Sequence, residues 1–196
     1  MKKNKESKEL LLICKENKNN MQRIRELINN KEYNLDINYQ DEEGNTALTY
    51  ACKAGRLHLV KYFLNSPYLK ENANPLILNN NNDNILMWSV SHPPLLIYLL
   101  NNPIIEKNVD IFQINKDYEN AFMLLCDFKY KNILENLIIN KNLNISSDTI
   151  DWLRKTTKST QDIYFDMLDI IEKRNLYINL NNDLNFSTNF NKKVKI

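Results

Sequence analysis

The chain has 196 residues, with 26 Lys and Arg against 24 Asp and Glu, so its formal net charge is only +2. This balance argues against a dedicated nucleic-acid-binding protein, which usually carries a large basic excess. Apolar residues make up 43% of the chain, enough for a packed core, but no apolar run approaches the roughly 20 residues of a membrane span. The 34 Asn residues are typical of an AT-rich genome.

The residues that usually carry catalysis or bind cofactors are few and scattered. Three cysteines, with no paired metal-ligand spacing, are expected to be reduced and buried: Cys14, Cys52 and Cys126. His58 and His92 stand apart, and two glycines are too few for a phosphate-binding loop. We therefore expect no catalytic residue, cofactor, metal site or small-molecule substrate. A cysteine-dependent enzyme with a non-local site is the weaker alternative.

The N-terminal part predicts a short basic tail over 1–6 and then a pair of helices, 8–17 and 21–30. The apolar run within the first helix is interrupted at Lys15 and Glu16, too early for a signal peptide. We therefore expect an intracellular protein, in the cytoplasm or the nucleus. Delivery into a host cell as an effector stays open.

The middle of the chain contains an internal repeat. Residues 45–52, 83–90 and 119–126 share one pattern at offsets of 38 and 36, and an apolar helix follows each of them, at 59–64, 95–100 and 133–138. Buried residues are predicted at Leu48, Leu86 and Phe122. A continuous core between repeats is predicted from Tyr50, Trp88 and Leu124. An Asp or Asn also recurs at the second position of 35–38, 73–76, 109–112 and 143–146.

Residues 41–64 resemble an ankyrin repeat, whose pattern is D-x-x-G-x-T-P-L-H-x-A-x-x-G followed by an apolar helix. The residues that fit are Asp41, Gly44, Thr46, Leu48, Ala51, Gly55, Val60 and Leu64, whereas Ala47 and Thr49 replace the usual Pro and His. The clear repeat covers 41–73, and its neighbours are degenerate. Asn82, Tyr118 and Lys129 stand where Gly is expected, so we expect distorted turns there.

The resemblance implies an all-α ankyrin-repeat solenoid of about five helix-turn-helix units with short hairpin-like loops and almost no sheet. The predicted domain covers 7–174, with units at about 7–40, 41–78, 79–114, 115–148 and 149–174. Helices over 148–157 and 160–174 are expected to form the C-terminal cap. An Asn- and Lys-rich tail, 175–196, is expected to pack loosely or not at all. The 65–79 loop is longer than usual in the family and is expected to expose Tyr68.

The resemblance also implies a non-enzymatic adaptor that binds a protein partner through a concave surface of loop tips and inner helices. Carried over by position, that surface comprises Glu42, Glu43, Asn45, Lys53, Asn80, Asn81, Asp83, Ser91, Lys116, Asp117, Glu119 and Asp127. Six of these are acidic and two are basic, which gives −4 and predicts a partner with a basic surface. A merely solvated face is the alternative for these charges. The basic tails leave open an accessory contact with nucleic acid or an anionic membrane, and we expect a monomer.

Overall fold

The structure is a computed structural model that describes residues 5–16, 20–141, 143–157 and 162–193. Over these residues the chain forms helices joined by turns and contains no strand, which confirms the all-helical fold. The chain divides into two compact units, residues 1–124 and 125–196. Most of the predicted basic N-terminal tail and the last three residues lie outside the described residues.

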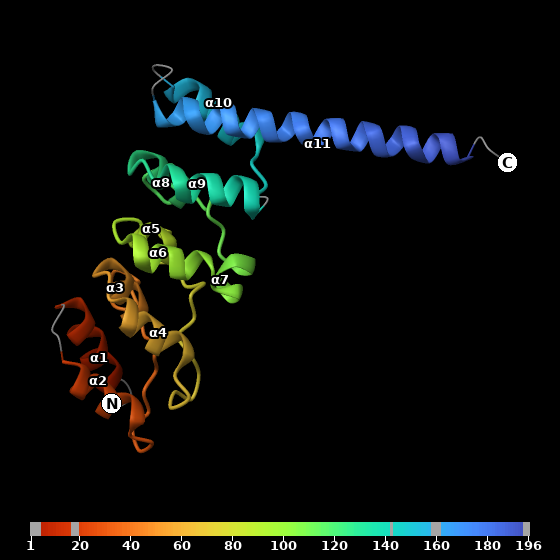
Figure 1. The fold of residues 1–196 in the computed structure, drawn as a ribbon. Helices are drawn as coiled ribbons and strands as arrows, with labels where there is room; N and C mark the ends of the chain where they lie inside the picture. Colours follow the sequence, from red (N-terminus) through yellow and green to blue (C-terminus); the bar gives the residue numbers. More distant parts are fainter. Residues whose placement is uncertain (1–4, 17–19, 142, 158–161, 194–196) are drawn as a thin grey trace. The chain divides into compact units, whose positions relative to one another are not determined.

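The first unit is built from successive helix pairs (Figure 1). Their bounds are α1 (Lys5–Lys15), α2 (Met21–Asn29), α3 (Ala47–Lys53), α4 (Leu57–Asn65), α5 (Ile85–Ser89) and α6 (Pro93–Leu100). The first helix of each pair packs on the next one along the chain, α1 on α3 and α3 on α5, so we call these three the inner helices. A short helix α7 (Pro103–Asn108) follows α6, and α8 (Ala121–Asp127) crosses the boundary between the units.

The predicted repeat register places the core residues correctly. Leu48, Leu86 and Phe122 are each no more than 2% exposed, as the sequence predicted. Tyr50 is also buried, but Trp88 and Leu124 are only partly buried. The predicted continuous core of these three residues is therefore wrong beyond Tyr50, because Trp88 and Leu124 line an open hollow in the surface.

Helices α3, α5 and α8 each begin after a polar residue that caps the helix. The Thr46 hydroxyl accepts a hydrogen bond from the Thr49 N–H at 3.1 Å, at the start of α3. At the equivalent positions, the Asn84 side chain accepts from two backbone N–H groups of α5, and the Asn120 side chain accepts from one in α8. Such caps satisfy backbone donors that have no partner inside the helix. They fix where each repeat begins.

The glycine-like turns keep their conformation even where glycine is absent. Gly44 and Gly55 have φ of 77° and 65°, and Asn82, Tyr118 and Lys129 have φ of 65°, 64° and 57°. The expectation that these turns would be distorted is therefore wrong. The three residues adopt the left-handed conformation instead, at a cost in conformational energy that glycine avoids.

The recurring Asp or Asn in the extended segments forms a local turn. In three of these segments its side-chain oxygen accepts a hydrogen bond from the backbone N–H two residues later; the acceptors are Asp36, Asn74 and Asp110. Such turns explain why a short acidic or amide side chain recurs there. In the long loop after α4, Tyr68 is 63% exposed, as predicted.

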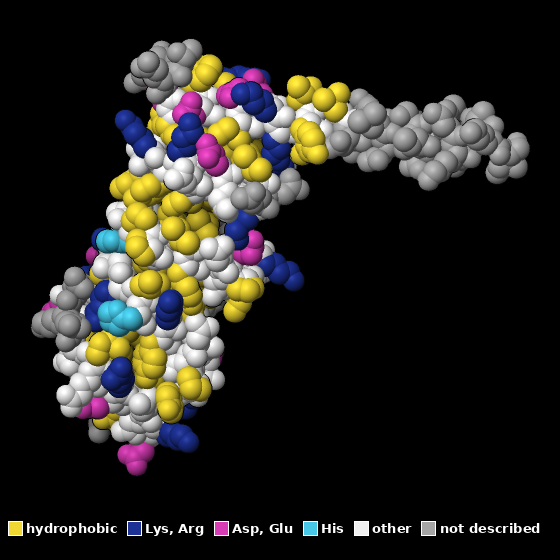
Figure 2. All heavy atoms as spheres, viewed as in Figure 1, with side chains coloured by type: hydrophobic (Ala, Val, Ile, Leu, Met, Phe, Trp, Pro, Cys, Tyr) yellow, Lys and Arg dark blue, Asp and Glu magenta, His cyan; other side chains and the backbone are white. Residues whose placement is uncertain are grey.

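The second unit contains α9 (Lys131–Glu135), which continues into the π-helical turn η1 (Asn136–Asn140), and then α10 (Ser147–Thr156) and α11 (Ile163–Lys193). Helix α10 packs on α11, and Leu153, Met167 and Ile171 are fully buried. Helix α11 continues past 174 to Lys193, so most of the predicted tail is helical. Figure 2 shows apolar side chains exposed on the described part of α11. Among the apolar residues of this helix, Leu176 and Leu180 are more than half exposed.

Candidate functional site

Three hairpins precede α3, α5 and α8, and we call residues 41–45, 79–83 and 115–119 hairpins 1, 2 and 3. Each is folded around its first residue: Asp41, Asn79 or Asn115. The Oδ1 atom of that residue accepts hydrogen bonds from the N–H groups two and four residues later, at 2.8–3.0 Å. One short polar side chain therefore sets the shape of each hairpin.

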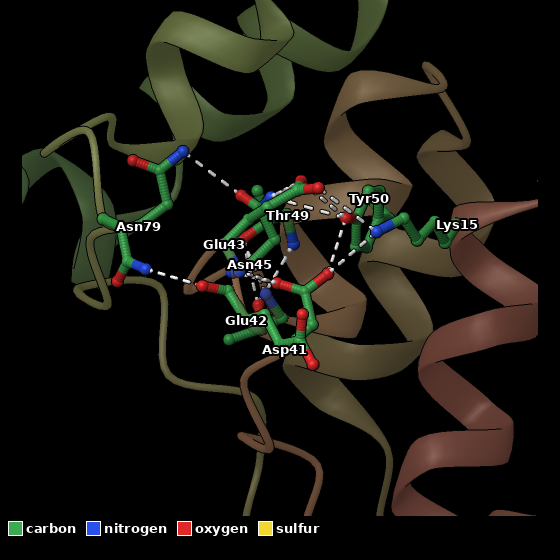
Figure 3. A network of polar contacts seen from close by, with 10 residues as sticks. Lys15, Asp41, Glu42, Glu43, Asn45, Thr49, Tyr50 and Asn79 are labelled. Atoms are coloured by element: carbon green, nitrogen blue, oxygen red, sulfur yellow. Dashed lines mark hydrogen bonds and ion pairs between the residues drawn. The ribbon is translucent and has the colours of Figure 1, made fainter.

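Hydrogen bonds also join each hairpin to the next. The Asn80 N–H donates to the Glu43 carbonyl, and the Lys116 N–H donates to the Asn81 carbonyl, both at 2.9 Å. Two side-chain bonds run beside them, from Asn79 Nδ2 to Asn45 Oδ1 at 3.2 Å (Figure 3) and from Asn115 Nδ2 to Asp83 Oδ1 at 2.8 Å. We call this row of bonds the hairpin ladder. It holds the three hairpins at fixed spacing.

The structure separates the predicted surface residues into two groups. Asn45 and Asp83 are buried in the hairpin ladder, at 6% and 8% exposed, so they serve the fold rather than a surface. Asn81 is half-buried. The other residues predicted in the first unit are exposed: Glu42, Glu43, Lys53, Asn80, Ser91, Lys116, Asp117 and Glu119. Four of these are acidic and two are basic, so their charge is −2 rather than the expected −4.

Asp127 belongs to the second unit. Its carboxylate accepts a hydrogen bond from the Tyr164 hydroxyl. Burial and the bond to Asp127 raise the pKa of Tyr164 above its usual range. Asp127 is thus engaged inside its own unit.

Lys15, which the sequence analysis did not place on this surface, binds hairpin 1 (Figure 3). Its Nζ lies 3.3 Å from Asp41 Oδ2, 3.5 Å from Glu43 Oε1 and 5.4 Å from the centre of the Tyr50 ring. Its interactions with Tyr50 and Asp41 raise the pKa of Lys15. Burial acts to raise the pKa of Asp41, but hydrogen bonds from Tyr50, the Asn45 backbone and Lys15 outweigh it and lower that pKa.

A second lysine has a similar arrangement one repeat later. The Nζ of Lys53, the last residue of α3, lies 4.4 Å from the centre of the Trp88 ring of α5. Lys15 is likewise the last residue of α1 and lies 35 residues before Tyr50, the same spacing that separates Lys53 from Trp88. The 38-residue offset between the two lysines could have revealed this pattern from the sequence.

A hollow of about 210 Å³ is lined by hairpins 2 and 3 and by residues of α5 and α8. Its lining consists of Asn81, Asp83, Met87, Trp88, Asn115, Asp117, Glu119 and Leu124. It therefore combines carboxylates at the hairpins with the apolar surfaces of Met87, Trp88 and Leu124. We call it the hairpin hollow.

The cysteines do not have the properties of catalytic nucleophiles. All three are free and buried, as predicted. Burial raises the pKa of Cys14 and Cys126 to about 12 and that of Cys52 further still. Because the thiolate is the nucleophile, a buried and protonated thiol does not fit a cysteine-dependent enzyme.

Within the described ranges, no three His, Cys, Asp or Glu side chains gather in a way that could hold a metal ion. None of the helices in that part of the chain is both long enough and apolar enough to cross a membrane.

The comparisons with known proteins agree with this geometry. Residues 10–111 match the family model for ankyrin repeats, in three copies. No curated protein matches the chain. The matched segment covers more than half of the 196 residues and includes hairpins 1 and 2 with their inner helices. The chain therefore belongs to the ankyrin repeat family.

Proposed function

We propose that the chain is a non-enzymatic protein-binding module whose partner presents a basic surface to the three hairpins and the inner helices. Ankyrin repeats are generally protein–protein interaction modules. The observation that carries the proposal is the row of exposed carboxylates at the hairpins, Glu42, Asp117 and Glu119, on backbone that the hairpin ladder holds in place.

Preorganised hairpins and their charge both favour binding of such a partner. Hairpins that are already ordered lose little conformational freedom when a partner binds, so less of the interaction energy is spent on ordering them. Carboxylates of one sign on a fixed row attract a basic partner and raise its association rate, an effect that salt screens. Asp117 and Glu119 matter most, because Lys15 is ion-paired with Asp41 and Glu43 at hairpin 1, whereas neither Asp117 nor Glu119 forms an ion pair with a described residue, although Lys116 lies on the same hairpin.

We also place the protein inside a cell. Its three cysteines are unpaired and buried. Reduced thiols are typical of the cytosol and nucleus, whereas secreted proteins usually pair theirs.

In the test, peptides that bind the full chain are selected from a random display library. Their association rates with the full chain are then measured at several salt concentrations. The test variant replaces Glu42, Asp117 and Glu119 by Ser. The matched control replaces Glu26, Glu32 and Glu71 by Ser, which removes the same charge from exposed positions away from the hairpins.

We expect the selected peptides to be basic. The test variant should slow their association by about tenfold at low salt and flatten its salt dependence, while the control keeps wild-type behaviour. Wild-type rates and salt response in the test variant would contradict the proposal.

A further inference from the structure

In two successive repeats, the lysine at the end of the inner helix lies beside the aromatic ring of the next repeat. We call each such position a step, and the series stops at the third step. Lys15 lies beside Tyr50, and Lys53 lies over Trp88. The residue equivalent to Lys53 one repeat later, at the offset of 38, is Ser91. The residue equivalent to Trp88, at the offset of 36, is Leu124. At the third step, Ser91 therefore stands where α1 and α3 end in a lysine.

Hairpin 3, which belongs to the third step, nevertheless carries two carboxylates. By the same offsets, Asp117 is equivalent to Glu43, whose carboxylate lies 3.5 Å from Lys15 Nζ. Glu119, on the same hairpin, adds a second exposed carboxylate. Asp117 accepts a hydrogen bond of 2.7 Å from Asn81 Nδ2, and it forms no ion pair with any residue that the structure describes. Hairpin 3 also carries Lys116, so its net charge is −1, but Asp117 lacks the ion pair that Glu43 makes with Lys15.

The hairpin hollow has the shape and chemistry that a basic side chain requires. Its volume is about 210 Å³, it is open to solvent, and its lining includes Asp117 and Glu119. The apolar surfaces of Met87, Trp88 and Leu124 can cover the methylene stem of a lysine or arginine, whose charged end stays at the hairpin. The hairpin carboxylates are favourable neighbours for that charged end, whereas the Trp88 ring already has Lys53 over it.

We propose that the hairpin hollow is a subsite for one Lys or Arg side chain of the protein partner. At hairpin 1 the cation is Lys15 of the chain itself, whereas at the hairpin hollow the cation would come from the partner. This inference rests on the proposed function and narrows it to one place and one side-chain chemistry.

The first test needs no identified partner. N-acetyl-lysine methylamide is titrated into the full chain, and the indole N–H signals of the two tryptophans are followed by NMR. The norleucine methylamide is the control probe, because it keeps the stem and lacks the charge. We expect a saturable shift of the Trp88 signal with the lysine probe only. The Trp152 signal, from the second unit, should not move.

Two pairs of variants locate the binding. Replacing Asp117 by Asn and Glu119 by Gln should weaken lysine-probe binding by about tenfold, whereas Glu32→Gln with Glu71→Gln should leave it unchanged. Ser91→Lys places a lysine at the third step. The new side chain should compete with the lysine probe and weaken its binding by about tenfold. Ser91→Gln, which is long but neutral, should not.

The inference is overturned if Trp88 shows no saturable response, if it responds equally to the norleucine probe, or if Ser91→Lys behaves like Ser91→Gln. Any of these results alongside library peptides that still depend on Glu42, Asp117 and Glu119 would remove the subsite and leave the proposed function standing. The reverse result, with a saturable subsite and no hairpin-dependent peptide, would remove the proposed function alone.

Discussion

Replacing Tyr118 by Gly should stabilise the protein, although it removes a large side chain. Tyr118 has a φ of 64° and is 83% exposed, so its side chain contributes little buried area to lose. The left-handed conformation costs a non-glycine residue about 1–2 kcal/mol. Glycine costs about 0.5–1 kcal/mol through the greater freedom of the unfolded chain. The difference favours Gly by about 0.5–1 kcal/mol.

The assay is urea unfolding followed by circular dichroism, with the shift of the midpoint read at an unchanged slope. Tyr68→Gly is the matched control, because Tyr68 is also exposed but does not have a positive φ. We expect this control to lose about 0.5–1 kcal/mol. Asn82→Gly should gain less than Tyr118→Gly, because Asn tolerates the left-handed conformation. If Tyr118→Gly destabilises the chain as much as Tyr68→Gly, the reasoning about backbone cost is refuted.

Leu86→Ala should cost about 2–5 kcal/mol of unfolding free energy, because Leu86 is 2% exposed; a loss near zero in urea unfolding would contradict its burial. Gly44→Ala should cost more than about 1 kcal/mol, because φ is 77° and the new Cβ would lie 2.7 Å from the Asn80 backbone nitrogen. An unchanged midpoint would contradict that. A thiol reagent at pH 8 should label none of the cysteines in the folded chain and three after denaturation. The thiol contribution to stability should be complete below about pH 9 and lost as the pH rises toward 12, because burial raises the pKa of Cys14 from 9.0 to about 12. Flat stability across that range would oppose it.

The repeat register was predictable because the same packing contacts recur in each repeat along the chain. An inner helix must bury the same face in each unit, so the offsets of 38 and 36 were enough to place Leu48, Leu86 and Phe122 in the core. Trp88 was harder to place, since its position faces a hollow whose size depends on neighbouring side chains.

The hairpins show why the candidate surface was only partly predictable. Asn45 and Asp83 look like surface residues in the sequence, but they are buried because each hydrogen-bonds to the next hairpin. That bond depends on how the hairpin folds around Asp41 or Asn79, which a repeat pattern does not specify. Lys15 was missed because α1 belongs to the repeat that precedes the first clear ankyrin repeat.

The C-terminal helix illustrates a different limit. The many Asn residues after Arg174 favour a tail by composition, since Asn is a modest helix former. However, no Pro or Gly follows Ile163 within α11, so nothing in the local sequence stops the helix before Lys193. The absence of a helix breaker was therefore the better signal.

The most direct test of the central claim is carbodiimide cross-linking of the complex between the full chain and its bound partner, because this reagent joins carboxylates directly to lysine amines. The protein-binding proposal predicts cross-links from Glu42, Asp117 and Glu119 to lysines of the partner, with Asp117 and Glu119 most often joined. Cross-links confined to Glu26, Glu32 and Glu71, with the hairpin carboxylates unmodified, would contradict it.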